Sequence, residues 1–270
     1  MSKIKVVVTG ASGRMGKEII KKVLSDKKLK LIGAIENNNH PTIGKDVGLI
    51  IKKKKVGLRI TDSILESFAM ADAVIDFTTP KATVEHAKYA AQARLAHVIG
   101  TTGFNKNQLL KIKYAAQHAT IIKSGNMSLG VNLVEALTKI ASSKLDEAFF
   151  INVNETHHKH KVDAPSGTAL SLLEAVRAEL SQEPTVAHGR SGIVGPRSKG
   201  EVGMHALRGG DVVGEHSVIF ALEGERIELT HRASTRTNFA QGAVAAAKWL
   251  SAQSSAGLYG MEHLIANRET

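Results

Sequence analysis

The segment IKVVVTGASGRMGKEII, residues 4–20, decides the fold of the first part of the chain. Its residues Val6, Val7 and Val8 form a continuous β-branched run, which is typical of a strand buried on both faces of a parallel sheet. The glycine-rich sequence GASGRMG follows at residues 10–16 and leads into the helical pattern KEIIKKVL. A strand, a glycine-rich turn and a helix in this order allow backbone amides to approach a pyrophosphate at the helix N-terminus.

The glycines have the spacing G-x-x-G-x-x-G, which is also found in tight turns that bind no ligand. The next predicted strand, LKLIGAIE, favours a binding role, because it ends in Glu36, twenty positions after Gly16. An acidic residue at this place can accept hydrogen bonds from the adenosine ribose hydroxyls. The two features together predict a dinucleotide-binding fold. Asn37 stands where an arginine would favour a 2′-phosphate, so the sequence leans toward NADH over NADPH.

Predicted strands and helices continue to alternate up to Met127. The sequences ADAVIDFTTP (71–80), HVIGTTG (97–103) and TIIKSG (120–125) each read as a strand followed by a loop, with helical patterns between them. This alternation predicts an α/β fold with a doubly wound, Rossmann-type parallel sheet. Each loop alone is more typical of an ordinary turn, but ligands on such sheets bind beyond the carboxyl ends of the strands. The shared edge of these loops therefore indicates a cofactor site.

The pattern changes after Met127, and we expect a second, α+β domain there. The boundaries expected are 1–127 for the dinucleotide-binding domain, completed by 238–270, and 128–237 for a substrate-binding and tetramerisation domain. Residues 188–203 read as a long mobile loop. Residues 204–233 alternate apolar and polar side chains, which predicts antiparallel strands in a mixed or antiparallel sheet. Residues 239–264 read as helical. An outer sheet face suited to self-association is expected to carry Val212, Val213, Val218, Phe220, Ile227 and Leu229.

The segment ETHHKHKVDAPSGTAL, residues 155–170, is the strongest candidate for a reactive site. Histidines at 157, 158 and 160 alternate with lysines at 159 and 161, and a Pro-Ser-Gly-Thr turn then opens an apolar helix. Histidine titrates near neutrality, lysine donates protons or holds anions, and a helix N-terminus favours a carboxylate or phosphate. The alternatives are a solvated charged hairpin with an ordinary helix cap, or a metal site. A metal is disfavoured because the segment precedes a turn and no H-E-x-x-H pattern exists.

Composition narrows the possible function classes. The chain has no cysteine, which excludes disulfides, thiolate metal sites and a dehydrogenase that acts through a covalent thioester. The formal net charge is +11, but the densest lysine run, residues 52–55, has no interleaved aromatic residues and reads as a solvated loop. No signal segment or membrane span is apparent, so we expect a cytoplasmic protein without membrane or nucleic-acid partners. A non-catalytic cofactor-sensing or nucleic-acid-binding protein is the alternative.

In its motifs the chain resembles the family of 4-hydroxy-tetrahydrodipicolinate reductases, also called dihydrodipicolinate reductases. The matching sequences run in family order over nearly the whole chain: GASGRMG, Glu36, GTTGF at 100, GNMSLGVN at 125, HHKHKVDAPSGTA at 157, GGDVVGEHSV at 209, HRASTR at 231 and FAQGAV at 239. The resemblance implies reduction of a small cyclic dicarboxylate by NADH and/or NADPH in the diaminopimelate route to lysine. It also implies a homotetramer built through the sheet of the central domain.

The resemblance further implies roles for individual residues. His157 matches the acid/base histidine and Lys161 the lysine proton donor, while His158, Gly167 and Thr168 match substrate-binding positions. The positions that match cofactor contacts are Gly10, Ala11, Ser12, Gly13, Arg14, Met15, Glu36, Gly100, Thr101, Thr102, Ser124, Gly125, Asn126 and Met127. No metal ligand is implied. Asn37 departs from the family pattern, because relatives that use NADPH readily often carry arginine there.

Overall fold

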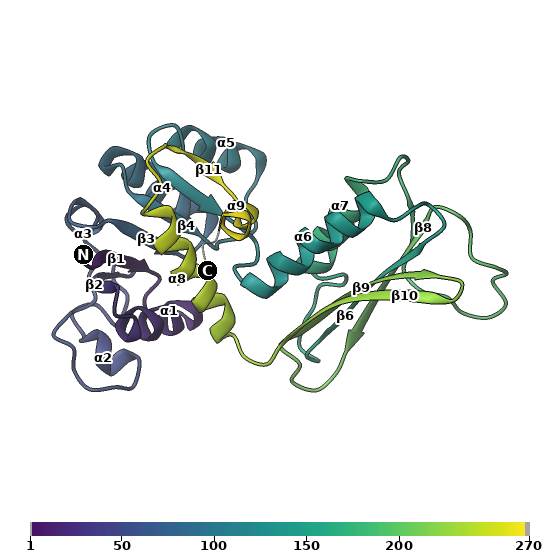
Figure 1. The fold of residues 1–270 in the computed structure, drawn as a ribbon. Helices are drawn as coiled ribbons and strands as arrows, with labels where there is room; N and C mark the ends of the chain where they lie inside the picture. The colour runs from purple at the N-terminus through teal and green to yellow at the C-terminus, as the bar shows by residue number, and fades with distance from the viewer. Residues whose placement is uncertain (1, 268–270) are drawn as a thin grey trace. The chain divides into compact units, whose positions relative to one another are not determined.

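The structure, a computed structural model, describes residues 2–267 and divides into two compact units. The first unit contains residues Met1–Leu129 and Arg236–Thr270, and the second contains Gly130–Thr235. Figure 1 shows the C-terminal segment, in yellow, returning to the first unit after the chain has built the second. Within the described residues no helix is both long enough and apolar enough to cross a bilayer.

A parallel sheet forms the centre of the first unit, as the alternating pattern predicts. Its strands lie in the order β11-β5-β4-β3-β1-β2, and every neighbouring pair is parallel. The strands are β1 (Ile4–Thr9), β2 (Leu29–Ile35), β3 (Ala73–Asp76), β4 (Ala96–Ile99), β5 (Thr120–Lys123) and β11 (Gly257–Tyr259). The prediction of helix across 239–264 is wrong at β11, where Leu258 pairs with Ile121 of β5 and extends the sheet.

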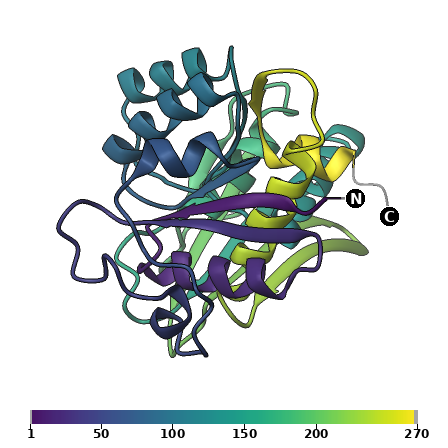
Figure 2. The same cartoon turned by 90° about the vertical axis from the view of Figure 1, so that its left-hand side faces the viewer.

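Helices cover both faces of this sheet. They are α1 (Arg14–Ser25), α2 (Val47–Ile50), α3 (Ile64–Ala69), α4 (Pro80–Ala93), α5 (Lys106–Ala115), α8 (Thr237–Leu250) and α9 (Met261–Ala266). Figure 2 shows α1 and α8, in purple and yellow-green, side by side on one face, with α4 and α5 on the other. Val6 and Val8 pack toward α1 and α8, whereas Val7 packs with Phe68 of α3 on the opposite face. The continuous valine run is therefore buried on both sides, as expected for a central parallel strand.

The second unit contains a mixed sheet with the strand order β10-β9-β6-β8-β7. Its strands are β6 (Phe150–His157), β7 (Thr185–Ala187), β8 (Glu201–Arg208), β9 (Gly214–Leu222) and β10 (Glu225–Ala233), and its helices are α6 (Leu129–Lys144) and α7 (Gly167–Arg177). Strand β9 is antiparallel to both β6 and β10, which confirms the antiparallel part of the prediction. Strand β8 instead runs parallel to β6 and to β7, so the prediction of antiparallel pairing is wrong for this strand.

The apolar residues expected on the outer face of this sheet lie mainly on its inner face. Val218 and Phe220 are fully buried and share a cluster with Leu172 and Val176 of α7, and Leu229 packs against the same cluster. The opposite face carries polar residues such as Asn154. Alternation shows which side chains share a face of a strand, but not which face the helices cover.

The loop before β8 is shorter than expected and is attached to the sheet. Strand β8 begins at Glu201, inside the segment 188–203 that reads as a mobile loop. Arg197 donates hydrogen bonds of 2.6 Å to the carbonyl oxygens of Ile151 and Glu201, and one of 2.9 Å to Asn152 Oδ1. The guanidinium also lies 5.2 Å from the centre of the Phe150 ring. Arg197 therefore fixes the end of this loop on the sheet.

Candidate active site

The glycine-rich turn of residues 10–16 is compact. Gly10 has φ +65°, a left-handed conformation that favours glycine, and its carbonyl accepts the Gly13 N–H at 3.0 Å. A Cβ on Gly16 would lie 2.1 Å from the Gly10 oxygen, so no side chain fits there. Helix α1 starts with Gly13 as its N-cap, without a side-chain cap and without an acidic residue in its first turn. This end of α1, with Arg14 as its first residue, fits a pyrophosphate.

Glu36 lies next to this turn, directly after β2. Its Oε1 accepts the Ser12 N–H at 2.7 Å and its Oε2 accepts the Asn37 N–H at 3.3 Å. The hydroxyl of Ser12 lies 2.6 Å from Thr42 Oγ1, which fixes the other side of the turn. The structure therefore brings the expected ribose carboxylate and the expected pyrophosphate turn together, as the spacing in the sequence predicts.

The other expected cofactor positions follow β4 and β5 at the same carboxyl edge of the sheet. Gly100, Thr101 and Thr102 come directly after β4, and Ser124, Gly125, Asn126 and Met127 come directly after β5. The Thr101 and Met127 side chains are buried, with 5% and 1% of their surface exposed. A Cβ on Gly242 of α8 would lie 1.6 Å from the Met127 carbonyl oxygen, so α8 packs directly on this loop. A contact of Thr101 or Met127 with a cofactor would therefore have to use the backbone.

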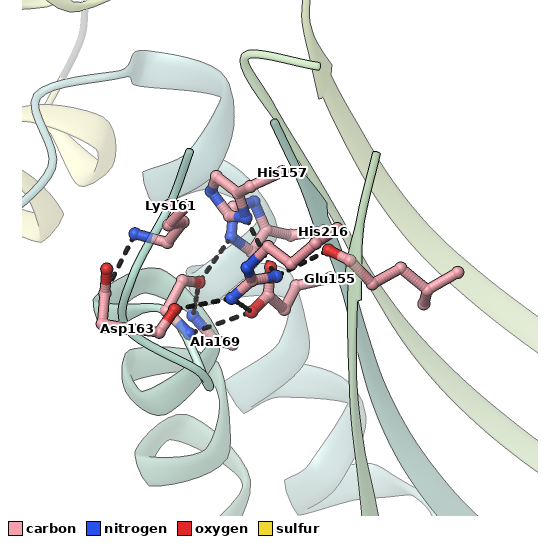
Figure 3. A network of polar contacts seen from close by, with 9 residues as sticks. Glu155, His157, Lys161, Asp163, Ala169 and His216 are labelled. Atoms are coloured by element: carbon pink, nitrogen blue, oxygen red, sulfur yellow. Dashed lines mark hydrogen bonds and ion pairs between the residues drawn. The ribbon is translucent and has the colours of Figure 1, made fainter. Parts of the chain in front are cut away.

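In the second unit, His157 lies at the end of β6 and is held by Glu155 (Figure 3). The Nδ1–H of His157 donates to Oε2 of Glu155, which is 1% exposed. Arg208 donates 2.9 Å and 2.8 Å hydrogen bonds to the two carboxylate oxygens, and the Ser166 N–H donates to Oε1 at 3.1 Å. Burial alone would raise the pKa of Glu155, but the hydrogen bonds from Arg208 and His157 outweigh it and lower the pKa. Glu155 is thus an ionised carboxylate that orients the imidazole.

A second histidine, His216 on β9, packs against His157. The two ring centres lie 5.0 Å apart in an edge-to-face arrangement, and Nε2 of His216 lies 3.0 Å from Ser166 Oγ. The same hydroxyl accepts the Ala169 N–H at 3.2 Å and caps α7. Burial lowers the pKa of His216 to about 4, and the charge that His157 carries when protonated contributes to this shift in the same direction. His216 is therefore neutral near pH 7 and links β9 to the start of α7.

The remaining expected site residues surround this network. Lys161 Nζ donates a 2.9 Å hydrogen bond to Asp163 Oδ2, and the Lys161 side chain is 20% exposed. His158 follows His157, and its Nδ1 is buried without a hydrogen-bond partner among the described residues. Gly167 and Thr168 form the first turn of α7, where helix N–H groups favour an anion. The structure thus places these residues around the hydrogen-bonded pair of Glu155 and His157.

Comparison with known proteins identifies the family. The model of the N-terminal part of dihydrodipicolinate reductase matches residues 4–127, and the model of its C-terminal part matches 130–265. The 4-hydroxy-tetrahydrodipicolinate reductase of Ruegeria pomeroyi is 52% identical over 246 residues, 90% of this chain and 91% of the relative. The enzyme of the same name from a Chelativorans species is 53% identical over 254 residues, 92% of this chain and 91% of the relative.

The chain belongs to the dihydrodipicolinate reductase family. It is therefore a nicotinamide-dependent oxidoreductase. The fold agrees with this assignment. A dipicolinate-bound dihydrodipicolinate reductase from Paenisporosarcina sp. TG-14 has a TM-score of 0.79 at 23% identity, over 97% of this chain and 99% of the other. An amine dehydrogenase from Mycobacterium smegmatis has a TM-score of 0.65 at 14% identity, over 95% of this chain and 94% of the other.

Three residues of this reductase's candidate site were not expected from the sequence: Glu155, Arg208 and His216. Glu155 could have been found, because it lies two positions before His157 and so on the same face of β6. Arg208 pairs with His157 across β6 and β8, and His216 pairs with Glu155 across β6 and β9. Only the register of the sheet reveals these pairs, and a single sequence contains no signal for it.

Proposed function

We propose that the protein reduces 4-hydroxy-tetrahydrodipicolinate to tetrahydrodipicolinate with NADH or NADPH, in the diaminopimelate route to lysine. One hydride and one proton are taken up, and the 4-hydroxyl group leaves as water. The observation that carries the proposal is the Glu155–His157 pair, surrounded by Lys161, His158 and the start of α7. Curated relatives about 50% identical over nine-tenths of the chain carry the name of this reaction. The alternative, a cofactor-sensing or nucleic-acid-binding protein without catalysis, has no matching feature in this arrangement.

In this proposal the carboxyl edge of the parallel sheet holds the cofactor. The turn at Gly10 and the N-terminus of α1 bind the pyrophosphate, and Glu36 accepts hydrogen bonds from the adenosine ribose. The loops after β4 and β5 supply the remaining contacts, those of Thr101 and Met127 from the backbone. When bound, the reduced nicotinamide supplies a hydride.

Lys161 is the proton donor in this proposal. Burial lowers the pKa of His157, with the charges of Lys161 and Arg208 acting in the same direction, while Glu155 opposes the shift. His157 is then neutral at pH 7, and because its Nδ1–H is bound to Glu155, its Nε2 carries a lone pair rather than a proton. The Nζ of Lys161 therefore delivers the proton that balances the charge of the hydride. His157 serves as a proton acceptor through the lone pair on its Nε2.

The substrate carboxylates need cationic and hydrogen-bond-donating groups. The first turn of α7 offers the N–H groups of Gly167 and Thr168 at the positive end of the helix. Nδ1 of His158, which has no hydrogen-bond partner in the part of the chain that the structure describes, supports a further polar contact. A small dicarboxylate is therefore the substrate class that this site supports. The expected cytoplasmic location and the expected homotetramer, built through the sheet of the second unit, stay predictions.

The test is oxidation of NADH, and then of NADPH, by the purified protein with substrate formed in place from pyruvate and aspartate semialdehyde by the preceding enzyme. Oxidation should depend on this substrate. Lys161→Met should lower kcat at least a hundredfold with the Kd for NADH unchanged, because the proton donor is lost and the side-chain length is kept. The matched control is Lys159→Met, an exposed lysine two positions away, which should retain most of the activity. Absence of oxidation by folded protein would contradict the proposal.

A further inference from the structure

Asp76, the last residue of β3, is a buried carboxylate that the proposed chemistry does not use. Its side chain has no exposed surface. Its Oδ1 accepts the Thr78 N–H at 3.0 Å and the Thr78 hydroxyl at 2.6 Å. Its Oδ2 accepts the His86 Nδ1–H at 2.8 Å and lies 3.4 Å from Nε2 of His97. A buried carboxylate is tolerated only where donors of this kind compensate its lost hydration.

These contacts keep Asp76 ionised. Burial alone would raise the pKa of Asp76, but the contacts with His86 and His97 outweigh it and hold the pKa far below its ordinary value. Burial lowers the pKa of His97, which is itself fully buried. Asp76 therefore stays ionised near neutral pH and accepts three hydrogen bonds, two from Thr78 and one from His86, with His97 beside it.

The network extends from Asp76 into the loop after β4. The Thr78 N–H also lies 3.1 Å from Thr101 Oγ1, which accepts the Thr83 hydroxyl at 2.8 Å. The Gly100 N–H donates to the backbone oxygen of Asp76 at 2.9 Å. Thr83 is fully buried and Thr101 is 5% exposed. The loops after β3 and β4 and the first turn of α4 are therefore joined by one set of buried hydrogen bonds.

The loop after β3 also touches both glycine-containing turns of the proposed cofactor site. A Cβ on Gly10 would lie 3.0 Å from the Thr78 methyl group, and a Cβ on Gly100 would lie 2.2 Å from the Phe77 ring. Gly10 and Gly100 therefore leave little room between these turns and residues 77 and 78. A displacement of residues 77–79 is transmitted to both turns, because a packed interior has no free space to absorb it.

We propose that Asp76 is a positioning residue for the dinucleotide: it fixes residues 77–79 and, through them, the turn at Gly10 and the loop that begins at Gly100. The inference rests on the proposed function for the identity of the cofactor, and it adds a residue that touches neither cofactor nor substrate. It concerns binding of the cofactor rather than the chemical step.

The test is Asp76→Asn, with NADH affinity measured by titration calorimetry in the absence of substrate. The amide keeps the shape but offers one acceptor oxygen in place of two, and its NH2 group faces donors. We expect the Kd for NADH to rise at least tenfold, the KM for NADH to rise in parallel, and kcat to change less than threefold. The KM for the dicarboxylate substrate should stay within twofold.

A paired substitution at Thr78 tests the route of the effect. Thr78→Val keeps the methyl group next to Gly10 and loses the hydroxyl that donates a hydrogen bond to Asp76, whereas Thr78→Ser keeps this hydroxyl. We expect Thr78→Val to raise the Kd for NADH. The double variant Thr78→Val/Asp76→Asn should have the same Kd as Asp76→Asn alone, because both changes break the same hydrogen bond. Thr78→Ser should retain the hydrogen bond and show the smaller change. If Asp76→Asn fails to fold, the test is the comparison of the Kd for NADH between Thr78→Val and Thr78→Ser.

The control for a general loss of stability is Leu264→Ala, which removes a buried side chain from α9 in the same unit. It should lower the unfolding temperature with the Kd for NADH unchanged. A folded Asp76→Asn protein with a Kd for NADH within twofold of wild type would overturn the positioning role of Asp76. It would leave the proposed reaction of the wild-type protein unaffected. An equal rise in Leu264→Ala would also overturn it. Wild-type protein that binds no reduced nicotinamide would overturn both proposals.

Discussion

Arg208 of β8 binds the buried carboxylate of Glu155 on β6 through two hydrogen bonds, of 2.9 Å and 2.8 Å. The same guanidinium donates 2.6 Å hydrogen bonds to the backbone oxygens of Leu207 and Asp163. Glu155 in turn holds the imidazole of His157 and the backbone N–H of Ser166. The ion pair of Arg208 and Glu155 therefore joins His157, the proposed acid/base residue, to the start of the helix that is proposed to bind the substrate.

The first prediction concerns the pKa of His157 in Glu155→Gln. The hydrogen bond and charge of Glu155 raise this pKa, whereas burial and the charges of Lys161 and Arg208 lower it. Without the carboxylate, only the lowering causes remain and Arg208 loses its counter-charge, so the pKa of His157 should fall. NMR titration of the histidine ring protons measures it. Asp163→Asn, which removes an exposed carboxylate bound to Lys161, should leave the pKa of His157 almost unchanged. An unchanged or raised pKa in Glu155→Gln would contradict the prediction.

The second prediction concerns acid stability and His216. Its pKa is lowered by burial from 6.5 to about 4, so the unfolded chain binds the proton more readily than the folded one. The folded state should therefore lose stability as the pH falls from 6.5 to about 4, by on the order of 3 kcal/mol from this residue. In His216→Gln the amide nitrogen can still face Ser166, and this part of the pH dependence should disappear. Denaturant unfolding at pH 7, 5.5 and 4 measures it.

The control for this comparison is His118→Gln, an exposed histidine in the first unit, which should show the wild-type pH dependence. The relevant quantity is the difference in unfolding free energy between wild type and His216→Gln. A difference that does not vary with pH would mean that His216 titrates in the folded protein as it does in the unfolded chain.

The dinucleotide unit could be predicted from the sequence because its signals are local. The valine run, the glycine turn and Glu36 lie within the 31 residues from Val6 to Glu36, and a parallel sheet places the loops after its strands at one edge. Strand β11 was missed because it is short and follows an apolar helix. Its strand character comes from pairing with β5, a long-range contact.

The second unit could be predicted only in part. Alternation revealed strands, and the segment 155–170 revealed the reactive residues, but the pairing of β6 with β8 and β9 joins positions about 50 residues or more apart. The register of β6 with β8 and β9 therefore determines that Arg208 and His216 lie next to Glu155. It also decides that Phe220 faces α7 rather than a neighbouring molecule.

The third prediction concerns the attachment of the loop at Arg197. Arg197→Met keeps the apolar contact with Phe150 but removes the donors to Ile151, Asn152 and Glu201. The unfolding free energy should fall by about 2 kcal/mol, because partly buried acceptors lose a charged donor. Thermolysin, which cleaves before apolar residues such as the exposed Ile193, should cut the variant faster. Lys199→Met, an exposed cation in the same loop, is the control and should match wild type. Equal cleavage rates would show that Arg197 does not hold the loop.

The fourth prediction concerns Glu36. Glu36→Gln keeps the size of the side chain but weakens the hydrogen bonds that it accepts from the ribose hydroxyls. The KM for NADH should therefore rise about tenfold with kcat nearly unchanged. Glu66→Gln removes an exposed carboxylate from α3 in the same unit and should not alter KM. Initial rates at varied NADH measure both. An unchanged KM in Glu36→Gln would mean that the ribose lies elsewhere.

The fifth prediction concerns the choice between NADH and NADPH. Asn37 is exposed and follows Glu36, whose carboxylate repels a 2′-phosphate. Asn37→Arg would place a guanidinium beside that carboxylate, and arginine binds phosphate with paired hydrogen bonds. The KM for NADPH should therefore fall about tenfold, and the KM for NADH should change less than threefold. Asn38→Arg adds the same charge one residue further along the loop and should have a smaller effect. If both variants improve NADPH use equally, the effect is general attraction of an anion, and residue 37 does not set the preference.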